Sequence, residues 1–233
     1  MNGFVDIHCH IIPYVDDGAV DLDEAIKMLK MEYAEGVRTI IATPHFRFKM
    51  FETPRMDIIK HFMILREEAR KIGIEMYLGC EFHANMEMLH LLREKKVSSM
   101  GGSRYVLTEF SGAADYPYIR ERTVALVSGG YKPIIAHIER IECLRKDFRM
   151  IEELVELGAK VQINTESIVR GFSTKRFCKK LMQADLLHFV GTDCHGTEYR
   201  IPKMKDAYKY VAKTFGSDYA DEIFISNPLQ ILK

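Results

Sequence analysis

Short apolar runs alternate with amphipathic stretches of helical period along most of the chain, and this alternation restricts the fold more than any other feature. Such a pattern is typical of β-α units repeated around a parallel sheet. It predicts seven strands, at Phe4–Ile7, Val37–Ala42, Glu75–Gly79, Tyr105–Glu109, Lys132–Ala136, Lys160–Asn164 and Phe189–Gly191. A sheet of this kind can close as a barrel or stay open, and periodicity alone does not decide between the two.

The predicted helices carry recognisable start and stop signals. Asp21 is the expected N-cap of the first helix, with Glu24 three residues later, and Gly36 ends that helix. Further helices are expected at Asp57–Lys71, Met86–Lys95, Ile119–Ser128 and Met150–Leu157. Each follows a predicted strand, as β-α units require.

Length and composition favour one domain covering residues 1–233. A chain of 233 residues lies within the range of one α/β barrel, and no Pro/Gly/Ser-rich linker interrupts it. Lys plus Arg equals Asp plus Glu at 33 each, which argues against a nucleic-acid partner. The N-terminal segment shows no secretory pattern and no long apolar run occurs, so we expect a cytoplasmic protein without stable membrane insertion.

The five cysteines do not form a CxxC pair, and their odd number argues against a disulfide framework. We therefore expect reduced thiols and no structural zinc site of the cysteine type. Any bound metal must rely on histidine and carboxylate ligands.

Residues of ligand type stand at or just beyond the carboxyl ends of six predicted strands. They are His8, His10, His45, Glu81, Glu109, His137, Asp193 and His195. In a parallel barrel all carboxyl ends of the strands lie on one face, so these side chains would converge although they are distant in sequence. This placement favours a barrel over an open sheet.

The spacing of His8 and His10 suits a metal ion, because residues two apart on an extended strand point the same way. Asp16-Asp17-Gly18 follows, where glycine permits a tight turn and the carboxylates supply hard oxygen ligands. Mixed nitrogen and oxygen donors accommodate Mn²⁺, Fe²⁺, Zn²⁺ or Mg²⁺. A carboxylate such as Glu81 can bridge two ions, as in two-metal hydrolases.

Six motifs together resemble those of the polymerase-and-histidinol-phosphatase (PHP) superfamily. They are Asp6-Ile7-His8-Cys9-His10-Ile11-Ile12-Pro13, Asp16-Asp17-Gly18, Thr43-Pro44-His45, Gly79-Cys80-Glu81, His137-Ile138-Glu139-Arg140 and Asp193-Cys194-His195. Within that superfamily the chain is most similar to the manganese-dependent protein-tyrosine phosphatases of bacterial capsular and exopolysaccharide operons. Met50-Phe51-Glu52-Thr53-Pro54, Ser103-Arg104-Tyr105 and Asn227-Pro228 also fit that branch.

The resemblance implies a distorted (β/α)7 TIM-like barrel, the PHP fold, holding three divalent metal ions, with Mn²⁺ the first choice. It assigns His8, His10, Glu81 and Asp193 to the first ion. Glu81 would bridge to a second ion with Glu109 and His137. Asp17, His45 and His195 would hold the third.

The resemblance also implies the chemistry. Arg140 and Arg200 would bind the phosphate and stabilise the transition state, a metal-bound hydroxide would attack phosphorus, and Asp193 or His195 would relay the leaving-group proton. The implied substrate is a tyrosine-phosphorylated protein, the tail of a bacterial tyrosine autokinase that controls capsule or exopolysaccharide synthesis. Clustered cations and planar arginine donors suit the charge-spread transition state of phosphoryl transfer.

Four other functions stay open. A small-molecule phosphatase of the same superfamily, such as one acting on histidinol phosphate, could share nearly every ligand. Thiol catalysis is disfavoured, although Cys143 with Arg149 and Cys194 with Arg200 have the Cys-x5-Arg spacing, because neither intervening loop is small and glycine-rich. An amidohydrolase is disfavoured because this sequence has no lysine at a predicted strand end to bridge two metal ions. A non-enzymatic scaffold is disfavoured because the sequence retains the full set of ligand residues.

The other histidines and one loop have more ordinary interpretations. His61, His90 and His188 are expected in surface or packing roles. His83 could face the metals or the rim of the pocket. Residues 46–49 could flank a tyrosyl ring or simply pack.

Overall fold

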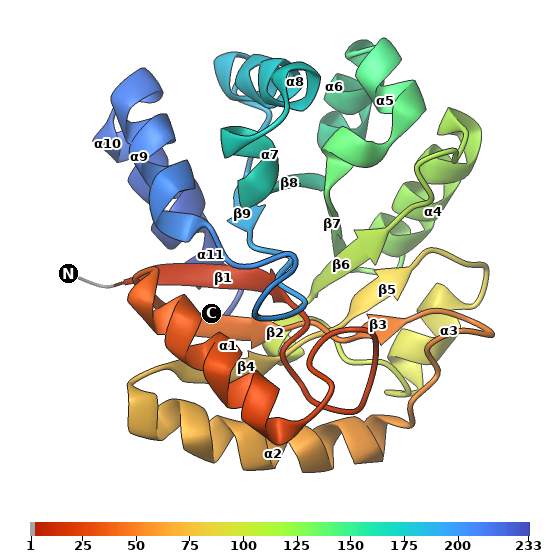
Figure 1. The fold of residues 1–233 in the computed structure, drawn as a ribbon. Coiled ribbons are helices and arrows are strands. Elements are labelled where there is room, and N and C mark those ends of the chain that lie inside the picture. Colours follow the sequence, from red (N-terminus) through yellow and green to blue (C-terminus); the bar gives the residue numbers. More distant parts are fainter. Residues whose placement is uncertain (1–2) are drawn as a thin grey trace.

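The computed structural model describes residues 3–233, and every strand pair in it is parallel (Figure 1). One hydrogen-bonded group has the order β1 (Phe4–Cys9), β2 (Val37–Ala42) and β4 (Glu75–Leu78). The other has the order β3 (His45–Phe46), β5 (Glu81–His83), β6 (Tyr105–Glu109), β7 (Lys132–Ile135), β8 (Lys160–Asn164) and β9 (Phe189–Gly191). The α/β class and the parallel sheet are confirmed.

The prediction missed two short strands, β3 and β5, and placed His45 and Glu81 just beyond the ends of the second and third predicted strands. Each continues a predicted strand after a two-residue break, at Thr43-Pro44 and at Gly79-Cys80. Hydrogen bonds carry the ladder across the breaks, with Gly79 N donating to Ala42 O at 2.8 Å and Glu81 N to Pro44 O at 3.0 Å. Segments of two or three residues are too short to show a hydrophobic period.

The sheet curls so that its first and last strands meet. Cys9 and Cys194 form a parallel bridge between the end of β1 and the segment after β9. Asp193 N donates to His8 O at 2.7 Å, and His10 N donates to Cys194 O at 2.9 Å. The first and last strands of the chain therefore lie side by side, whereas an open sheet would keep its two edges apart.

The helices cover the outer side of the curled sheet. They are α1 (Leu22–Ala34), α2 (Arg55–Ile72), α3 (Met88–Arg93), α4 (Tyr116–Ser128), α5 (Glu142–Lys146), α6 (Arg149–Glu156), α7 (Thr165–Val169), α8 (Phe172–Gln183), α9 (Met204–Phe215), α10 (Ser217–Asp221) and α11 (Asn227–Gln230). Short helical turns η1 (Met100–Gly102), η2 (Ile138–Arg140) and η3 (Glu222–Ser226) join them. Figure 1 shows α1 and α2 beside β1, β2 and β4, with α4 to α8 in an arc beside the other strands.

The predicted helix signals are confirmed in α1. Asp21 Oδ1 accepts a hydrogen bond from Glu24 N at 2.8 Å, and Gly36 beyond the helix has a φ of 90°. The helices predicted at 57–71, 86–95, 119–128 and 150–157 correspond to α2, α3, α4 and α6. No helix within residues 3–233 is long and apolar enough to cross a bilayer.

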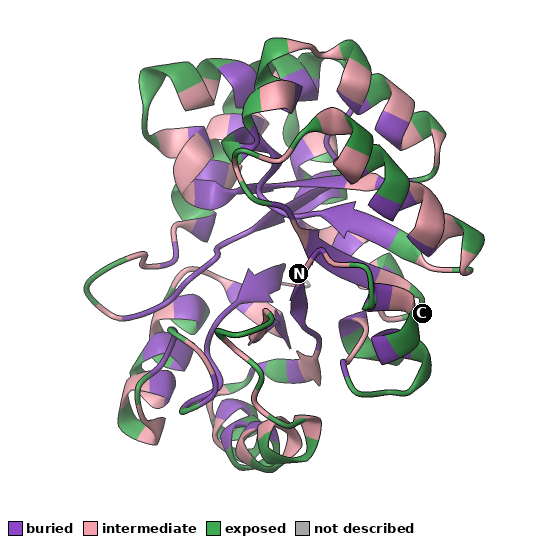
Figure 2. Ribbon diagram, turned by 90° about the vertical axis from the view of Figure 1, so that its right-hand side faces the viewer, coloured by how far each residue is buried: buried purple, intermediate pink, exposed green. Residues whose placement is uncertain are grey.

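Alternate residues along the strands belong to two buried apolar clusters, one on each face of the sheet. Val106 and Ile135 face the helices, whereas Leu107, Ile134 and Ile7 belong to a second cluster drawn from β1, β2, β6, β7 and β9. Figure 2 shows the strands buried at the centre and the helices exposing their outer faces. The second cluster fixes the strands whose carboxyl ends carry the polar residues described next.

Candidate metal centre

Four side chains from distant parts of the sequence meet at the carboxyl ends of the strands. His8, His10, Glu81 and Asp193 each offer one ligand atom within 4.8 Å of the others, and all four are buried. His8 Nε2 and His10 Nε2 each lie 3.1 Å from Glu81 Oε2. This set is the one that the resemblance assigned to a first metal ion.

Glu81 also reaches a second group through its other oxygen. His137 Nε2 lies 2.8 Å from Glu81 Oε1 and 3.9 Å from Glu109 Oε1. His45, Glu81 and Glu109 also form a group whose ligand atoms could hold a metal ion. Glu81 Oε1 therefore faces His137, whereas Oε2 faces His8, His10 and His45, so the carboxylate lies between ligand groups as a bridging residue would.

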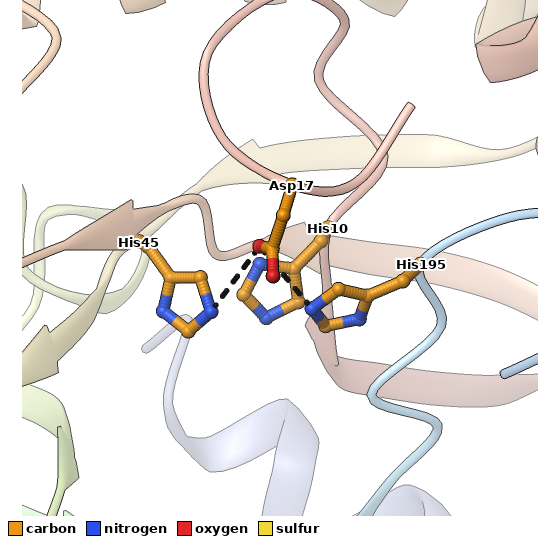
Figure 3. Close-up of side chains that lie close together, drawn as sticks. All are labelled: His10, Asp17, His45 and His195. Carbon is orange, nitrogen blue, oxygen red and sulfur yellow. Dashed lines mark ion pairs between the residues drawn. The ribbon is translucent and has the colours of Figure 1, made fainter. Parts of the chain in front are cut away.

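A third group lies nearer the surface and combines His10, Asp17, His45 and His195 (Figure 3). Asp17 Oδ1 lies 3.5 Å from His45 Nε2 and 3.6 Å from His195 Nε2. The Asp17 side chain is 52% exposed, unlike the ligands beneath it. Sequence reasoning named three of these residues together and placed His10 with another ion.

The loop carrying Asp17 is held against His10 by close backbone approach. A Cβ at Gly18 would come within 2.0 Å of His10 O, so only glycine fits there. Asp16 Oδ2 accepts hydrogen bonds from His10 Nδ1 at 2.8 Å and from His45 N at 2.9 Å. The turn pattern offered both carboxylates as ligands and the resemblance assigned only Asp17 to an ion, whereas the structure uses Asp16 to orient two histidines.

Several ligand atoms of this centre are buried without a hydrogen-bond partner. Within residues 3–233, nothing donates a hydrogen bond to Glu81 Oε2 or Asp193 Oδ1, and His195 Nε2 also has no partner. Imidazole nitrogens lie at ion-pair distance from both carboxylate oxygens, but not in hydrogen-bonding geometry. Each of these atoms lacks a hydrogen bond that would offset the cost of its desolvation. Divalent cations would satisfy them, so the donor set fits a metal cluster.

The electrostatics of the centre place Glu81, His45 and His195 in ligand form, whereas neighbouring carboxylates raise the pKa of His8 and His10 against the effect of burial. Burial alone would raise the pKa of the Glu81 carboxyl, but the neighbouring imidazoles of His8, His10 and His137 hold it well below its usual value. Burial, with the nearby His10, lowers the pKa of His45 and brings that of His195 to about 3. At neutral pH Glu81 is therefore ionised and both imidazoles are neutral, as metal coordination requires.

Both predicted arginines lie beside Asp193. Arg140 Nη2 is 2.9 Å from Asp193 Oδ2, and Arg200 Nη2 contacts the same oxygen. Their side chains are 48% and 26% exposed, so the guanidinium groups border the buried cluster and also reach solvent. Two planar cations in this position can bind an incoming phosphate.

Three residues of the centre have left-handed backbone conformations that side-chain-bearing residues rarely adopt. The φ angles of His137, Asp193 and Arg200 are 30°, 53° and 50°. Each conformation costs about 1–3 kcal/mol and needs support from the surrounding structure. That support comes from groups such as Gln162, which accepts a hydrogen bond from His137 N at 2.7 Å.

Sequence reasoning missed two orienting residues on β8. Gln162 Oε1 lies 3.3 Å from His8 Nδ1, and Asn164 Nδ2 donates to Asp193 Oδ2 at 2.6 Å. Both are buried amides two positions apart in an otherwise apolar strand, so they share one face. That spacing was visible in the sequence and is the signal that could have identified them.

The cysteine pairs do not form a phosphate-binding loop. Cys143 Sγ donates to Ala114 O at 3.3 Å, and Arg149 pairs with Asp147 at 2.8 Å. Burial raises the pKa of Cys143 and disfavours its thiolate. Cys194 is fully buried and its Sγ contacts Gly196 O at 3.6 Å. Thiol catalysis has no geometric support here.

Among the residues that the structure describes, the remaining histidines belong to none of the three ligand groups. His61 and His90 are on α2 and α3, and His188 accepts a hydrogen bond from Val161 N at 3.2 Å. His83 Nδ1 lies 2.9 Å from Glu109 Oε2, so it contacts one proposed ligand at the edge of the site.

Two surface features border the centre. A cavity of about 480 Å³ adjoins the third group and is lined by Asp17, His195, Tyr199 and Arg200 among others. The Phe51 ring stacks on His45, with centroids 5.2 Å apart, whereas Phe48 in the 46–49 loop is 44% exposed. The cavity therefore gives access to the third group beside Asp17 and Arg200.

Several known proteins are similar to this chain in sequence and in fold. The family described as capsular polysaccharide synthesis, CpsB/CapC, matches residues 4–233. Tyrosine-protein phosphatase CpsB of Streptococcus pneumoniae is 35% identical over 98% of either chain. A solved structure described among those of YwqE from Bacillus subtilis and CpsB from S. pneumoniae, as unique metal-dependent tyrosine phosphatases, superposes with a TM-score of 0.91 at 31% identity, covering 98% of this chain and 94% of that one.

A more distant structure shares the fold alone. Histidinol phosphate phosphatase from Lactococcus lactis has a TM-score of 0.64 at 14% identity, covering 93% of this chain and 94% of its own. The match over residues 4–233 and the high identity to CpsB confirm the branch that the motifs indicated. This chain belongs to the CpsB/CapC family of capsular polysaccharide synthesis.

Proposed function

We propose that the protein is a metal-dependent protein-tyrosine phosphatase that hydrolyses phosphotyrosine on a bacterial tyrosine autokinase and so regulates capsule or exopolysaccharide synthesis. Family membership and the tyrosine phosphatases among its relatives support this activity. The observation that carries it is the convergence of buried, unpartnered ligand atoms beside two arginines. Such a site suits a dianionic phosphate monoester.

The centre would hold three divalent cations, with Mn²⁺ proposed. His8, His10, Glu81 and Asp193 would bind one ion, and Glu81, Glu109 and His137 a second. Asp17, His45 and His195 would bind the third, which His10 also approaches. When bound, the cations would neutralise phosphate charge and make a water nucleophilic near neutral pH.

Arg140 and Arg200 would orient the phosphate and stabilise the charge of the transition state. Each guanidinium presents a rigid set of donors that matches phosphate oxygens. The Asp193 carboxylate on which both rest holds them at the edge of the cluster, and raises the pKa of Arg140 against the effect of burial. The Arg140 side chain therefore remains charged while a substrate binds.

Asp193 or His195 would pass a proton to the leaving tyrosyl oxygen. Neither stores a proton at neutral pH, since the pKa of His195 is about 3 and that of Asp193 is also lowered by neighbouring cationic groups despite burial. They would therefore relay a proton released during the reaction. His195 Nδ1 lies 2.9 Å from Asp193 O, which fixes the ring and leaves Nε2 towards the cluster.

The setting of the enzyme is part of the proposal. Residues 1–233 would form a single domain in which β3 continues β2 and β5 continues β4, giving a distorted (β/α)7 barrel closed where β1 meets the segment after β9. The protein would act in the cytoplasm on a phosphorylated protein, without a nucleic-acid partner and without stable membrane insertion.

A comparison of substrates tests the function. The Mn²⁺-loaded enzyme is assayed with p-nitrophenyl phosphate, a phosphotyrosyl peptide, the matching phosphoseryl peptide and histidinol phosphate. We expect turnover of the phosphotyrosyl peptide to exceed that of the phosphoseryl peptide and of histidinol phosphate. Turnover of histidinol phosphate alone would replace the proposal with a small-molecule phosphatase.

A further inference from the structure

Helix α8 (Phe172–Gln183) is strongly basic in a chain whose charges balance. It contains Lys175, Arg176, Lys179 and Lys180 and neither Asp nor Glu, although Lys plus Arg equals Asp plus Glu in the whole sequence. Arg176 and Lys180 stand one helical turn apart and are both exposed. This local excess of positive charge has no role in the metal centre.

A groove between α5 and α8 collects these charges. It encloses about 540 Å³ and is lined by Arg145, Lys146, Arg176 and Lys180. Its one lining carboxylate, Glu142, pairs with Lys146 at 3.3 Å. Across residues 3–233, Arg145, Arg176 and Lys180 form no ion pair with a carboxylate. The groove therefore presents three cations that lack a protein counter-charge.

Two aromatic residues, Phe148 and Phe177, are part of the lining of the groove. Phe148 and Phe177 lie edge to face with ring centroids 6.0 Å apart, and Lys180 Nζ lies 5.1 Å from the Phe148 centroid. Aromatic walls bind planar rings, whereas arginine and lysine bind phosphate. The two together match an aromatic phosphate monoester better than a simple inorganic anion.

The groove lies close to the proposed active site along the chain. Arg140, which contacts Asp193, ends η2, and Glu142 on the groove begins α5 two residues later. Arg145 Nη2 donates to Ser173 Oγ at 2.8 Å and so joins α5 to the start of α8. Both helices belong to the segments that follow β7 and β8 (Figure 1). The turn η2, which carries Arg140, contacts both α5 and α8, so the groove adjoins the element that supplies one of the two proposed phosphate-binding arginines.

We propose that the α5–α8 groove binds a second phosphotyrosine side chain of the peptide whose first phosphotyrosine occupies the metal centre. The inference rests on the proposed phosphatase function and adds a substrate-binding subsite outside the metal centre. Charge complementarity supports it, because each added phosphate brings close to two negative charges to a groove with an excess of cations.

The test uses the double variant Arg176→Glu/Lys180→Glu and two peptides that differ only in carrying one or two phosphotyrosines. We expect KM for the doubly phosphorylated peptide to rise about tenfold, the effect of one or two lost charge-assisted hydrogen bonds. KM for the singly phosphorylated peptide and kcat for both should stay unchanged. Lys209→Glu/Lys213→Glu on α9 is the matched control, with the same spacing, exposure and charge change.

A binding arm separates this inference from the proposed activity. Fluorescence anisotropy of the labelled doubly phosphorylated peptide on metal-stripped protein should show tighter binding to the wild type than to the α8 variant, whether or not turnover occurs. Equal affinity and equal KM in the two proteins would overturn the proposal that the groove binds phosphotyrosine. The same would follow if the α9 control lost as much affinity as the α8 variant. Absence of phosphopeptide turnover by the metal-loaded wild type would instead count against the phosphatase function. Should the α8 variant misfold by circular dichroism, Arg176→Gln/Lys180→Gln replaces it with the same expected direction.

Discussion

The interior of the curled sheet has two layers with opposite chemistry, although neighbouring residues of the same strands supply both. On β1, Ile7 belongs to the fully buried apolar cluster and His8 to the metal centre. After β7, Ala136 belongs to the apolar cluster and His137 contacts Glu81. Adjacent residues therefore differ in role: the apolar side chain stabilises the fold by its burial, whereas the polar side chain next to it needs a hydrogen-bond or metal partner.

The difference explains why the centre is built at the strand ends. We call the apolar cluster that contains Ile7 and Ala136 the lower layer and the metal centre the upper layer. Apolar burial in the lower layer contributes roughly 1.5–3 kcal/mol for each large side chain and holds the strands in place. In the upper layer, buried atoms such as Glu81 Oε2 and Asp193 Oδ1 lack hydrogen-bond partners among the described residues. The lower layer gives rigidity, and the upper layer uses that rigidity to keep costly groups together.

The largest expected effect comes from the upper layer. Glu81→Gln keeps the side-chain volume but removes the charge that faces two ligand groups. We expect phosphotyrosyl-peptide turnover to fall at least about 10³-fold, or roughly 4 kcal/mol of transition-state stabilisation. Mn²⁺ should raise the thermal unfolding midpoint of the wild type and not of this variant. The exposed Glu87→Gln serves as control, and retention of activity within tenfold by Glu81→Gln would remove the bridging role.

A cavity in the lower layer should give the reverse outcome. Ile134→Ala truncates a fully buried side chain of β7 and should lower the free energy of unfolding by about 3 kcal/mol. Turnover per folded molecule should stay within about twofold, a difference of roughly 0.4 kcal/mol. Urea unfolding and steady-state kinetics measure the two quantities, with Met63→Ala, at an exposed site on α2, as control. A fall in turnover as large as the stability loss would mean that the layers are not separable.

A smaller effect is expected from His188, which precedes β9 at the end opposite the metal centre. Burial, with help from Lys160, lowers its pKa to about 4 from an ordinary 6.5. The unfolded chain therefore takes up the proton first, and stability present above pH 6.5 is lost as the pH falls towards 4. We expect a loss of about 2 kcal/mol from this group after allowing for its partial exposure.

His188→Asn isolates that effect, because asparagine retains an acceptor for Val161 N but does not titrate. Chemical unfolding of both proteins at pH 7 and at pH 4 gives the comparison. The difference in stability between the two pH values should be smaller in the variant by this amount. An identical pH dependence in the two proteins would show that His188 is not the responsible group.

The smallest effect is expected at Cys143. Serine can keep the hydrogen bond to Ala114 O, and the thiol lies outside the ligand groups. Cys143→Ser should leave turnover within twofold and stability within about 0.5 kcal/mol, as for a typical surface substitution. An inactive but folded Cys143→Ser protein would revive the thiol mechanism.

Sequence reasoning predicted the parallel fold and the side chains that meet at the strand ends, because strand ends carry clear signals. An apolar run followed by His or Glu marks both a strand and the position of its ligand, as at His8 and Glu109. The short strands β3 and β5 gave no such signal, since pairing across the Pro44 and Gly79 breaks depends on tertiary contacts.

The finer geometry of the site was also outside the reach of the pattern. Asp16 and Asp17 are equivalent in sequence, yet the close contact of Gly18 with His10 turns one towards two histidines and leaves the other partly exposed. Likewise, His10 approaches two ligand groups because three distant segments meet there. Such sharing follows from the packing of the strands and not from spacing along one of them.

The central claim is that the upper layer is a metal centre on which phosphotyrosine hydrolysis depends. The most direct measurement strips the protein with a chelator, titrates it with Mn²⁺, and records bound Mn²⁺ per chain together with turnover of a phosphotyrosyl peptide. The account predicts no turnover in the stripped protein and full turnover when Mn²⁺ saturates at three ions per chain. Full turnover by the stripped protein, or restored turnover without bound metal, would contradict it.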